Sequence, residues 1–305
     1  MYFKVLFPSL LSLSLLVISC GGDKSNEPAN PNPSPEPEKP SVEVKQDVKA
    51  LTSNATRRYD LEESWIGFSD KATGNSIKLD PAQTYQSIDG FGAAITGSTA
   101  YNLMKMSQEN RTAFLKQTFS PTEGYGFSYV RVPIGCSDFS LSEYTCCDTP
   151  GIENFALTNE ETDYIIPVLK EILAINPNLK IMGSPWTAPI WMKVRDLSSL
   201  LPYQSWTSGQ LNPAYYDDYA TYFKNWIDAF AQNGIKIYSI TPQNEPLNRG
   251  NSASMYMSWQ EERDFIKNSL GPTLRNAGLN TKIYAFDHNY NYDGIGDQMN
   301  YPSKI

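Results

Sequence analysis

Five short apolar segments, separated by longer segments with helix signals, constrain the fold of this chain more than any other feature. They are residues 88–94, 129–134, 180–183, 237–241 and 283–286. Runs of this length bounded by turn residues predict buried strands, and their alternation with helices predicts a parallel sheet. The helix signals between them are Thr158 with Glu161, Ser258 with Glu261, Asn212 before Pro213, and the closing glycines Gly234 and Gly278. We therefore predict an α/β chain whose parallel sheet is either open or closed into a barrel.

The segment Gly90-Phe91-Gly92 favours the barrel. It lacks the third glycine and the acidic residue that a dinucleotide-binding sheet needs, and no glycine-rich phosphate loop opens any predicted helix. We interpret this segment as a site of tight backbone contact. In a (β/α)₈ barrel, the residues that carry the chemistry lie at the carboxyl ends of the strands.

Polar segments follow four of the five predicted strands, at 133–138, 184–186, 242–246 and 287–289. Glu245 comes soon after a strand and stands between Asn244 and Pro246, which indicates a carboxylate at the barrel mouth. The alternative for Glu245 is a buried ion pair with a residue such as Arg131. His288 is the only histidine, which argues against a Ser-His-Asp triad or a histidine-rich metal site. We predict neither a metal nor a cofactor.

Net charge excludes one class of partner. The 305 residues carry a formal charge of −8, whereas nucleic acids and anionic membranes require a basic face. Aromatic residues make up 12% of the chain, with 19 Tyr and 6 Trp. Rings that stack on sugars would produce this share, but composition alone favours an ordinary large core.

The first 41 residues are predicted to lie outside the fold. Residues 1–20 combine Lys4, an apolar run and a final cysteine, which is typical of an export signal. Val17-Ile18-Ser19-Cys20 resembles the bacterial lipoprotein cleavage box, which implies that Cys20 is lipidated and holds the protein at a membrane. The alternative is an ordinary cleaved signal with a chance cysteine. Residues 21–41 are rich in proline and predict an extended tether.

The remaining cysteines leave two alternatives open. An exported chain enters an oxidising compartment, where Cys136, Cys146 and Cys147 could form one disulfide. Their spacing matches no zinc pattern, and free buried thiols are an equal alternative. Nearer the amino terminus, segments 65–68 and 77–79 are predicted to be short strands.

Several motifs occur together and in order: QSIDGFG at 86–92, YVRVP at 129–133, CSDFS at 136–140, SPWTAP at 184–189, TPQNEP at 241–246, and DFI with LGPTL within 264–274. As a set they resemble glycoside hydrolase family thirty, which includes the glucosylceramidases. The resemblance implies a (β/α)₈ barrel from residue 86 to 305, incomplete after about five strands. It also implies a small accessory β-sandwich, to which residues 42–85 contribute strands.

The resemblance further implies retaining hydrolysis of β-glycosidic bonds by two carboxyl groups about 5 Å apart. Glu245 matches the general acid/base, and Asn244 matches the residue that binds the sugar 2-hydroxyl. Trp186 and Arg131 match positions that line the sugar subsite and support the carboxylates, with a purely structural role as the alternative for Arg131. His288 is a candidate for binding the leaving-group side of the substrate, or a capped loop histidine.

Two departures from the family pattern matter. Gly97 stands where the glucosylceramidase branch has an aspartate that grips glucose hydroxyls, which favours β-1,6-glucan as substrate. The nucleophilic glutamate of the family follows strand seven, so we expect it beyond residue 305 and expect the chain alone to be inactive. Glu261 and Glu262 fall within the helix that Ser258 opens, and neither can replace the nucleophile.

These inferences predict a retaining β-glucosidic hydrolase of the β-1,6-glucanase type, anchored to a bacterial membrane at its periplasmic face or on the cell surface. Its expected partners are a β-glucan or β-glucoside substrate and the lipid anchor at Cys20, with no nucleic acid. The alternatives are a glucosylceramidase-type β-glucosidase, a surface glycan-binding lipoprotein without catalysis, and an inactive truncation product.

Overall fold

The computed structural model describes residues 47–54, 57–68, 74, 80–251, 253–289 and 296–305. Two compact units make up the chain, Met1–Thr84 and Tyr85–Ile305. The predicted export signal, the tether and the predicted strand 77–79 lie outside the described residues, so lipidation of Cys20 stays a prediction. Within the described part, no helix combines the length and the apolar character needed to cross a bilayer.

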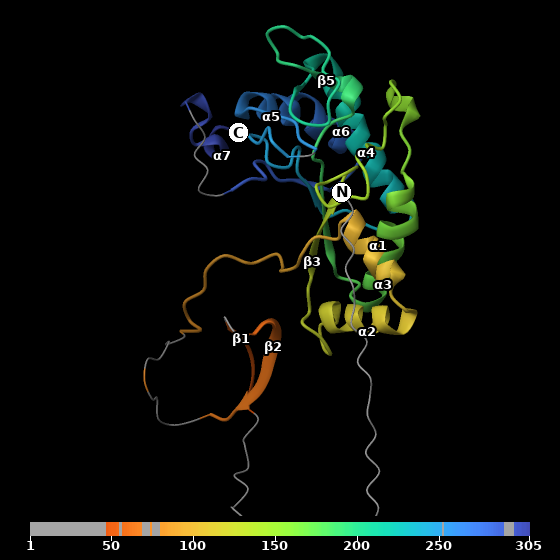
Figure 1. Cartoon of the computed structure of the whole chain (residues 1–305). Coiled ribbons are helices and arrows are strands. Elements are labelled where there is room, and N and C mark those ends of the chain that lie inside the picture. The colour runs from red at the N-terminus through yellow and green to blue at the C-terminus, as the bar shows by residue number, and fades with distance from the viewer. Residues whose placement is uncertain (1–46, 55–56, 69–73, 75–79, 252, 290–295) are drawn as a thin grey trace, which may run out of the picture. The chain divides into compact units, whose positions relative to one another are not determined.

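The first unit contains an antiparallel hairpin of β1 (Val48–Asn54) and β2 (Arg57–Ile66), drawn in orange in Figure 1. Lys49 and Glu63 form an ion pair of 2.8 Å on this hairpin. The prediction of a strand at 65–68 was wrong in its bounds, because the strand starts earlier and ends at Ile66. Apolar patterning could not reveal β1, since its large apolar side chains are exposed.

The second unit is built on a four-stranded parallel sheet, which confirms the predicted α/β class (Figure 1). Its strands are β3 (Tyr129–Pro133), β4 (Lys180–Ser184), β7 (Ser239–Ile240) and β8 (Lys282–Ile283). Each strand pairs with the next one along the chain, in the order β3-β4-β7-β8. A doubly wound sheet reverses this order at a switch point, whereas a (β/α) barrel keeps it. The strand order is therefore that of a partial barrel.

The predicted strand at 88–94 runs beside β3 but joins it in only one strand-type bridge, between Ala94 and Arg131. The glycines explain the irregular pairing. A Cβ at Gly92 would lie 1.4 Å from the carbonyl oxygen of Tyr129, and Gly90 has a φ of +149°. The tight backbone contact expected here is confirmed, but the regular strand is not.

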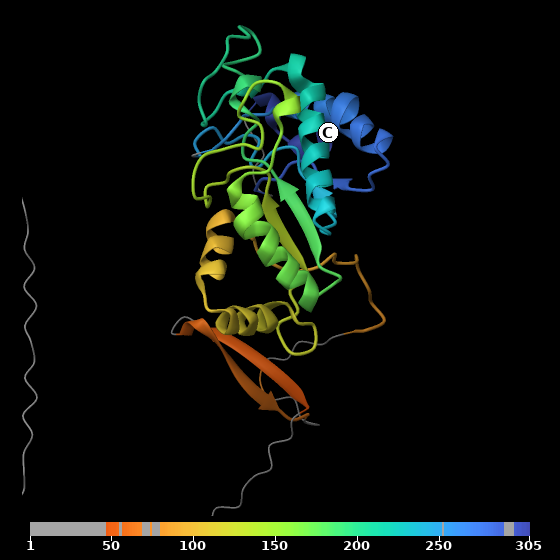
Figure 2. The ribbon, with the colours of Figure 1, turned by 90° about the vertical axis from the view of Figure 1, so that its right-hand side faces the viewer.

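Seven α-helices occur in the described residues: α1 (Gly97–Lys105), α2 (Gln108–Phe119), α3 (Ile166–Ile175), α4 (Tyr216–Gln232), α5 (Trp259–Phe265), α6 (Gly271–Asn276) and α7 (Tyr301–Lys304). Shorter elements are the strands β5 (Lys193–Val194) and β6 (Gln210–Leu211), the 3₁₀-helices Ile152–Asn154, Ile190–Met192, Pro213–Tyr215 and Gly296–Gln298, and the π-helical turns Glu161–Ile165 and Ile266–Leu270. Figures 1 and 2 together place α1, α3 and α4 on one side of the sheet.

Most of the predicted helix signals act as expected. At Thr158 the capping box is only half formed, because Glu161 accepts from the Thr158 N–H but the Thr158 hydroxyl accepts from the Glu160 N–H. Ser258 and Glu261 form a capping box at the start of α5, and the Asn212 side chain accepts a hydrogen bond from the Ala214 N–H. Gly234 and Gly278 follow α4 and α6 with φ angles of +78° and +68°, a backbone region that favours glycine.

Helix α4 buries five aromatic side chains, Tyr219, Tyr222, Phe223, Trp226 and Phe230. Trp226 lies directly over β4, because a Cβ at Gly183 would come within 2.8 Å of the Trp226 ring. A larger residue at position 183 would therefore displace the helix from the strand. This contact helps to fix β4, whose last residue is Ser184.

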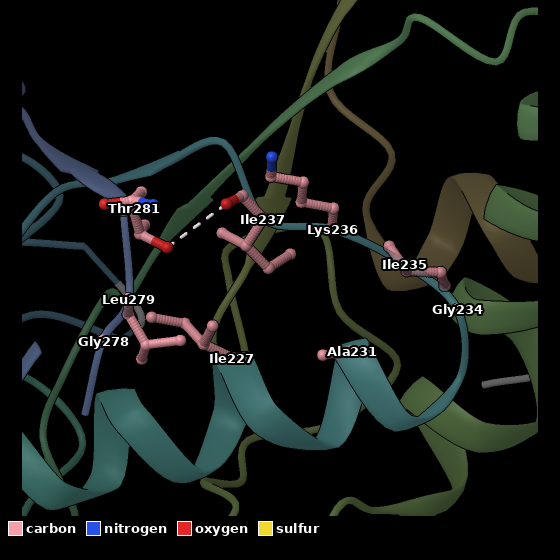
Figure 3. Close-up of a pocket in the computed structure, with 10 residues that line it drawn as sticks. Ile227, Ala231, Gly234, Ile235, Lys236, Ile237, Gly278, Leu279 and Thr281 are labelled. Carbon is pink, nitrogen blue, oxygen red and sulfur yellow. Dashed lines mark hydrogen bonds between the residues drawn. The ribbon is translucent and has the colours of Figure 1, made fainter.

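A pocket of about 450 Å³ lies between α4 and the segments that lead into β7 and β8 (Figure 3). Across it, the Thr281 hydroxyl donates a hydrogen bond of 3.2 Å to the carbonyl of Ile237. Both residues precede their strands, so this pocket opens at the amino ends of the sheet. The polar segments singled out in the sequence lie at the opposite, carboxyl ends.

Candidate active site

A polar network at the carboxyl ends of the sheet is centred on Arg131 of β3. Its Nη2 atom lies 2.8 Å from Ser184 Oγ, 2.7 Å from Asn244 Oδ1 and 2.5 Å from Asp287 Oδ2. These three partners stand at the end of β4 or follow β7 and β8. One guanidinium therefore ties together all four strands of the sheet.

Asp287 neutralises Arg131 and receives two further hydrogen bonds. Ser184 Oγ and Thr241 Oγ1 donate to Asp287 Oδ2 at 2.9 and 3.2 Å. The side chains of Arg131 and Asp287 are 25% and 24% exposed, so the pair is largely shielded from water. The sequence singled out segment 287–289 but did not identify Asp287 as the partner of Arg131.

Trp186 lies against this network. The guanidinium carbon of Arg131 stands 4.5 Å from the centroid of the Trp186 ring, which is the geometry of a cation–π contact. Gln243 Nε2 donates to the carbonyls of Trp186 and Asn244, at 2.6 and 3.0 Å. Gln243 thereby joins the loop after β4 to the loop after β7 and holds both in place.

Glu245 stands in a strained backbone conformation, with a φ of +46°. For a residue other than glycine, this region costs on the order of 1 kcal/mol or more. Two backbone bonds of 2.8 Å hold it, because the Glu245 N–H donates to the Asp287 carbonyl and the Asn248 N–H donates to the Glu245 carbonyl. Backbone strain of this kind is common at functional sites, where the surrounding structure holds the strained residue in place.

The carboxylate of Glu245 is half-buried and bound by two side-chain amides. Asn248 Nδ2 and Asn251 Nδ2 both donate to Glu245 Oε2, at 2.6 and 2.9 Å. The alternative of an ion pair between Glu245 and Arg131 was wrong, because Arg131 pairs with Asp287 instead. Sequence reasoning missed both asparagines, although the cluster of asparagines after β7 was a visible signal.

His288 is an electrostatic neighbour of Glu245. Its Nδ1 accepts a hydrogen bond of 2.8 Å from the Asn289 N–H, and its ring stacks on Phe286. Burial lowers the pKa of His288, while the negative charges of Glu245 and Asp287 act in the opposite direction. All five sequence-predicted site residues of the barrel therefore lie at the carboxyl ends of the sheet, and three of them, Arg131, Trp186 and Asn244, are joined through Arg131.

The comparison with known families decides the identity of this fold. Residues 88–293 match the glycosyl hydrolase family 30 TIM-barrel domain. The chain belongs to glycosyl hydrolase family 30. The five site residues lie within the matched range.

Two curated relatives illustrate the similarity. An endo-1,6-β-D-glucanase of Neurospora crassa is 37% identical over 270 residues, which cover 84% of this chain and 54% of that protein. The lysosomal acid glucosylceramidase of Mus musculus is 31% identical over 248 residues, which cover 76% of this chain and 46% of that protein. The chain thus spans about half the length of the curated relatives it matches.

A solved structure, that of the endo-β1,6-glucanase BT3312, is also similar to this chain. It has a TM-score of 0.78 and a sequence identity of 62%. The match covers 84% of this chain and 55% of that one. The order and arrangement of the strands described above therefore have a close counterpart in a solved enzyme.

The structure shows what surrounds Gly97, the position that the sequence analysis singled out as a departure from the family pattern. A Cβ at Gly97 would lie only 1.7 Å from Glu160 Oε1. Glu160 is 6% exposed and its Oε2 accepts a hydrogen bond of 2.9 Å from the Leu141 N–H. Burial raises the pKa of Glu160. This contact could not be predicted from the pattern of residues.

The two glutamates of α5 have other structural tasks in this family 30 chain. Glu261 completes the capping box and also accepts hydrogen bonds of 3.0 Å from Gln210 Nε2. Glu262 is buried and accepts a bond of 3.0 Å from the Phe286 N–H, and burial raises its pKa to about 7. Glu262 therefore supports the loop that carries Asp287 and His288.

The described part of the chain contains neither a cluster of metal ligands nor a disulfide bond. No group of three or more His, Cys, Asp or Glu side chains there is placed to hold a metal ion. Of the two alternatives left open for the cysteines, the structure has free buried thiols at Cys136, Cys146 and Cys147. Burial raises the pKa of the Cys136 thiol to about 12, so this sulfur stays protonated at neutral pH.

Proposed function

We propose that the full-length protein is a retaining glycoside hydrolase that cleaves β-glucosidic bonds and acts on β-1,6-glucan. The observation that carries the proposal is the placement of Glu245, a strained and half-buried carboxyl at the carboxyl end of a barrel strand. The names of its relatives support a glucan substrate, since an endo-1,6-β-D-glucanase is 37% identical to the chain and another is 62% identical.

In this mechanism Glu245 acts first as a general acid and then as a general base. A second carboxylate attacks the anomeric carbon while Glu245 gives its proton to the glycosidic oxygen, and the carbon–oxygen bond breaks with its electron pair on that oxygen. Glu245 then takes a proton from the water that releases the glycosyl group. We place the second carboxylate beyond residue 305, on a later strand of the barrel.

The remaining network residues bind and hold the sugar in this proposal. Asn244 receives a hydrogen bond on Oδ1 from Arg131, which leaves its amide N–H groups for a sugar hydroxyl. Trp186 lies beside the network with the guanidinium of Arg131 over its ring. His288 is an electrostatic neighbour of Glu245, and in this proposal it meets the leaving group. Arg131 holds Asn244 and Asp287 in register.

The surroundings of Gly97 favour β-1,6-glucan over glucosylceramide. An aspartate at this position grips glucose in the glucosylceramidase branch, and here the space is occupied by the buried carboxyl of Glu160. The alternative of a glucosylceramidase-type enzyme draws on the 31% identity to the lysosomal acid glucosylceramidase of mouse. We further propose that Cys20 anchors the protein by lipid to a bacterial membrane, as its signal-like segment predicts.

The test is product analysis with the full-length protein and its Glu245→Gln variant on β-1,6-glucan, β-1,3-glucan and glucosylceramide. Glu123→Gln is the matched control, because Glu123 is exposed and precedes β3 at the opposite end of the sheet. We expect hydrolysis of β-1,6-glucan that Glu245→Gln removes and Glu123→Gln preserves. Hydrolysis of glucosylceramide alone would favour the alternative enzyme, and glucan binding without products would indicate a glycan-binding protein.

A further inference from the structure

We propose that Asn248 and Asn251 are positioning residues that bind one oxygen of Glu245 and thereby assign the catalytic proton to the other oxygen, Oε1. This inference rests on the proposed function of Glu245 as the general acid. Both amides donate to Oε2, at 2.6 and 2.9 Å. A carboxyl oxygen offers two lone pairs, so two donors occupy those of Oε2 and leave Oε1 as the oxygen that is free to carry the proton.

The orientation of the Asn248 amide follows from its second contact. The Gly250 N–H donates to Asn248 Oδ1 at 2.8 Å, and a backbone N–H can bind only an acceptor. The oxygen of the amide therefore faces Gly250, and the nitrogen faces Glu245. A flipped amide would place two acceptors together at Glu245 and two donors together at Gly250.

The loop that carries the two asparagines is held by contacts at both ends. The Met257 N–H donates to the Pro246 carbonyl at 2.7 Å, and Ser254 Oγ donates to the Asn251 carbonyl at 3.3 Å. Between them, the guanidinium carbon of Arg249 stands 3.7 Å from the centroid of the Tyr256 ring. These contacts fix the amides before substrate arrives, which is what preorganisation of a proton donor requires.

Two neutral donors suit an acid that must become charged during the reaction. When the Oε1–H bond breaks, its proton goes to the glycosidic oxygen and Glu245 becomes a carboxylate. Hydrogen bonds to a charged acceptor are stronger than those to a neutral one, so the two amides stabilise the product of proton transfer. They therefore lower the barrier most where the leaving group needs a full proton.

Other charged groups near Glu245 also influence its carboxyl group. His288 and Asp287 face it from the end of β8, and Arg131 reaches the adjacent Asn244 from β3. Arg249 lies on the same loop as the asparagines. None of these groups is altered by a change at Asn248 or Asn251, so a shift in the pH profile can be assigned to the lost amide.

The experiment compares Asn248→Ala, Asn251→Ala, the double variant and Asn248→Asp in the full-length protein. The control is Asn178→Ala, because Asn178 is exposed at the amino end of β4. We measure kcat/KM against pH on a β-1,6-linked gluco-oligosaccharide and on an aryl β-glycoside of the same sugar with an activated leaving group. Melting temperatures identify variants that are merely unfolded.

For Asn248→Ala we expect about a ten-fold or larger loss on the oligosaccharide and a loss below about three-fold on the aryl glycoside. The basic limb of the profile should move to higher pH by about one unit, since the lost donor had favoured the carboxylate form. Asn248→Asp keeps the size of the side chain and should move this limb further in the same direction, because it adds a like charge.

Equal losses on both substrates, together with an unmoved basic limb in folded variants, would overturn the positioning role. A wild-type protein that hydrolyses neither substrate would instead overturn the proposed function, so the two failures are distinguishable. An Asn248→Asp profile that moves to lower pH would also contradict the inference, because it would place a donor rather than a carboxylate against Oε2.

Discussion

The two ends of the parallel sheet both carry a charged network, and the networks are built differently. At the amino end, Asp89 pairs with Lys180 at 2.7 Å, lies 3.7 Å from Lys282 and accepts a bond from Tyr238. These groups are substantially exposed, and the hydrogen bond from Lys180 is the main reason why the pKa of Asp89 falls to about 2. At the carboxyl end, Arg131 is shielded, and the carboxylate of Glu245 accepts hydrogen bonds from the neutral amides of Asn248 and Asn251.

The different partners of Asp89 and Glu245 indicate different roles for the two ends of the sheet. A carboxylate that lies between two lysines stays charged at neutral pH, which suits a structural ion pair. The carboxylate of Glu245 instead accepts from two amides, and in the described residues no lysine or arginine forms an ion pair with it. Barrel enzymes place chemistry at the carboxyl ends of the strands and stabilising contacts at the amino ends, and these two networks follow that division.

The largest expected effect is the loss of activity when Glu245, at the carboxyl end of the sheet, is replaced. Glu245→Gln in the full-length protein should lower hydrolysis of β-1,6-glucan by about 10²–10⁴-fold, the usual contribution of a general acid. The matching change at the other end, Asp89→Asn, should alter kcat/KM by less than about two-fold. Steady-state kinetics of both variants check this. A comparable loss in Asp89→Asn would show that the amino-end network also takes part in the chemistry.

Replacing Arg131 should cost more unfolding free energy than replacing Lys180 at the other end of the sheet. Arg131→Met leaves Asp287 largely shielded and unpaired, and we expect it to lower the free energy of unfolding by about 2–3 kcal/mol. Lys180→Met breaks an exposed pair and should cost less than about 1 kcal/mol. Urea unfolding of the full-length variants measures both. Similar costs would show that shielding does not distinguish the two ends.

The close contact between Gly97 and Glu160 can be tested by its effect on stability. Gly97→Asp places a side chain 1.7 Å from Glu160 Oε1, so we expect it to destabilise the protein by about 1–3 kcal/mol. The double variant with Glu160→Ala should recover most of this loss, because it clears the space. Thermal melting of the single and double variants forms the cycle. Additive losses would mean that the two residues are not in contact.

The smallest expected effect is a change in how stability depends on pH when Asp89 is replaced. The folded pKa of Asp89 is lowered to about 2 from a model-peptide value of 3.8, so its contribution to stability is present above pH 4 and is lost as pH falls toward 2. Asp89→Asn should therefore flatten the stability profile slightly in this window, and salt should weaken the difference because the group is exposed. Unfolding midpoints at pH 5, 4 and 3 test this, and an unchanged slope would contradict it.

Sequence patterns were sufficient wherever local chemistry decides the structure. The apolar runs at β3 and β4 and the capping box at Ser258 are set by neighbours along the chain, and the sheet and the start of α5 follow from them. Glu245 could be placed at the carboxyl end of a strand for the same reason. The irregular pairing of segment 88–94 could not be predicted, since it depends on how closely Gly92 approaches Tyr129.

The parts of the site that sequence reasoning missed depend on folding of the loops. Asn248 and Asn251 bind Glu245 only because the loop turns back at Asn248, and the direction of an amide is not written in the spacing of residues. Glu160 meets Gly97 through tertiary packing between segments that are far apart along the chain. Patterns of residue type identify which strand end is polar, but they do not identify which side chains touch there.

The single guanidinium that ties four strands together also has a consequence for folding order. Its partners Ser184, Asn244 and Asp287 are 53, 113 and 156 positions away along the chain. Closing such long loops costs entropy before any contact rewards it, so contacts of this range form late in folding. During synthesis the network cannot close until Asp287 has left the ribosome and β8 has joined the sheet. The geometry around Arg131 is therefore a late marker of correct folding as well as a frame for the site.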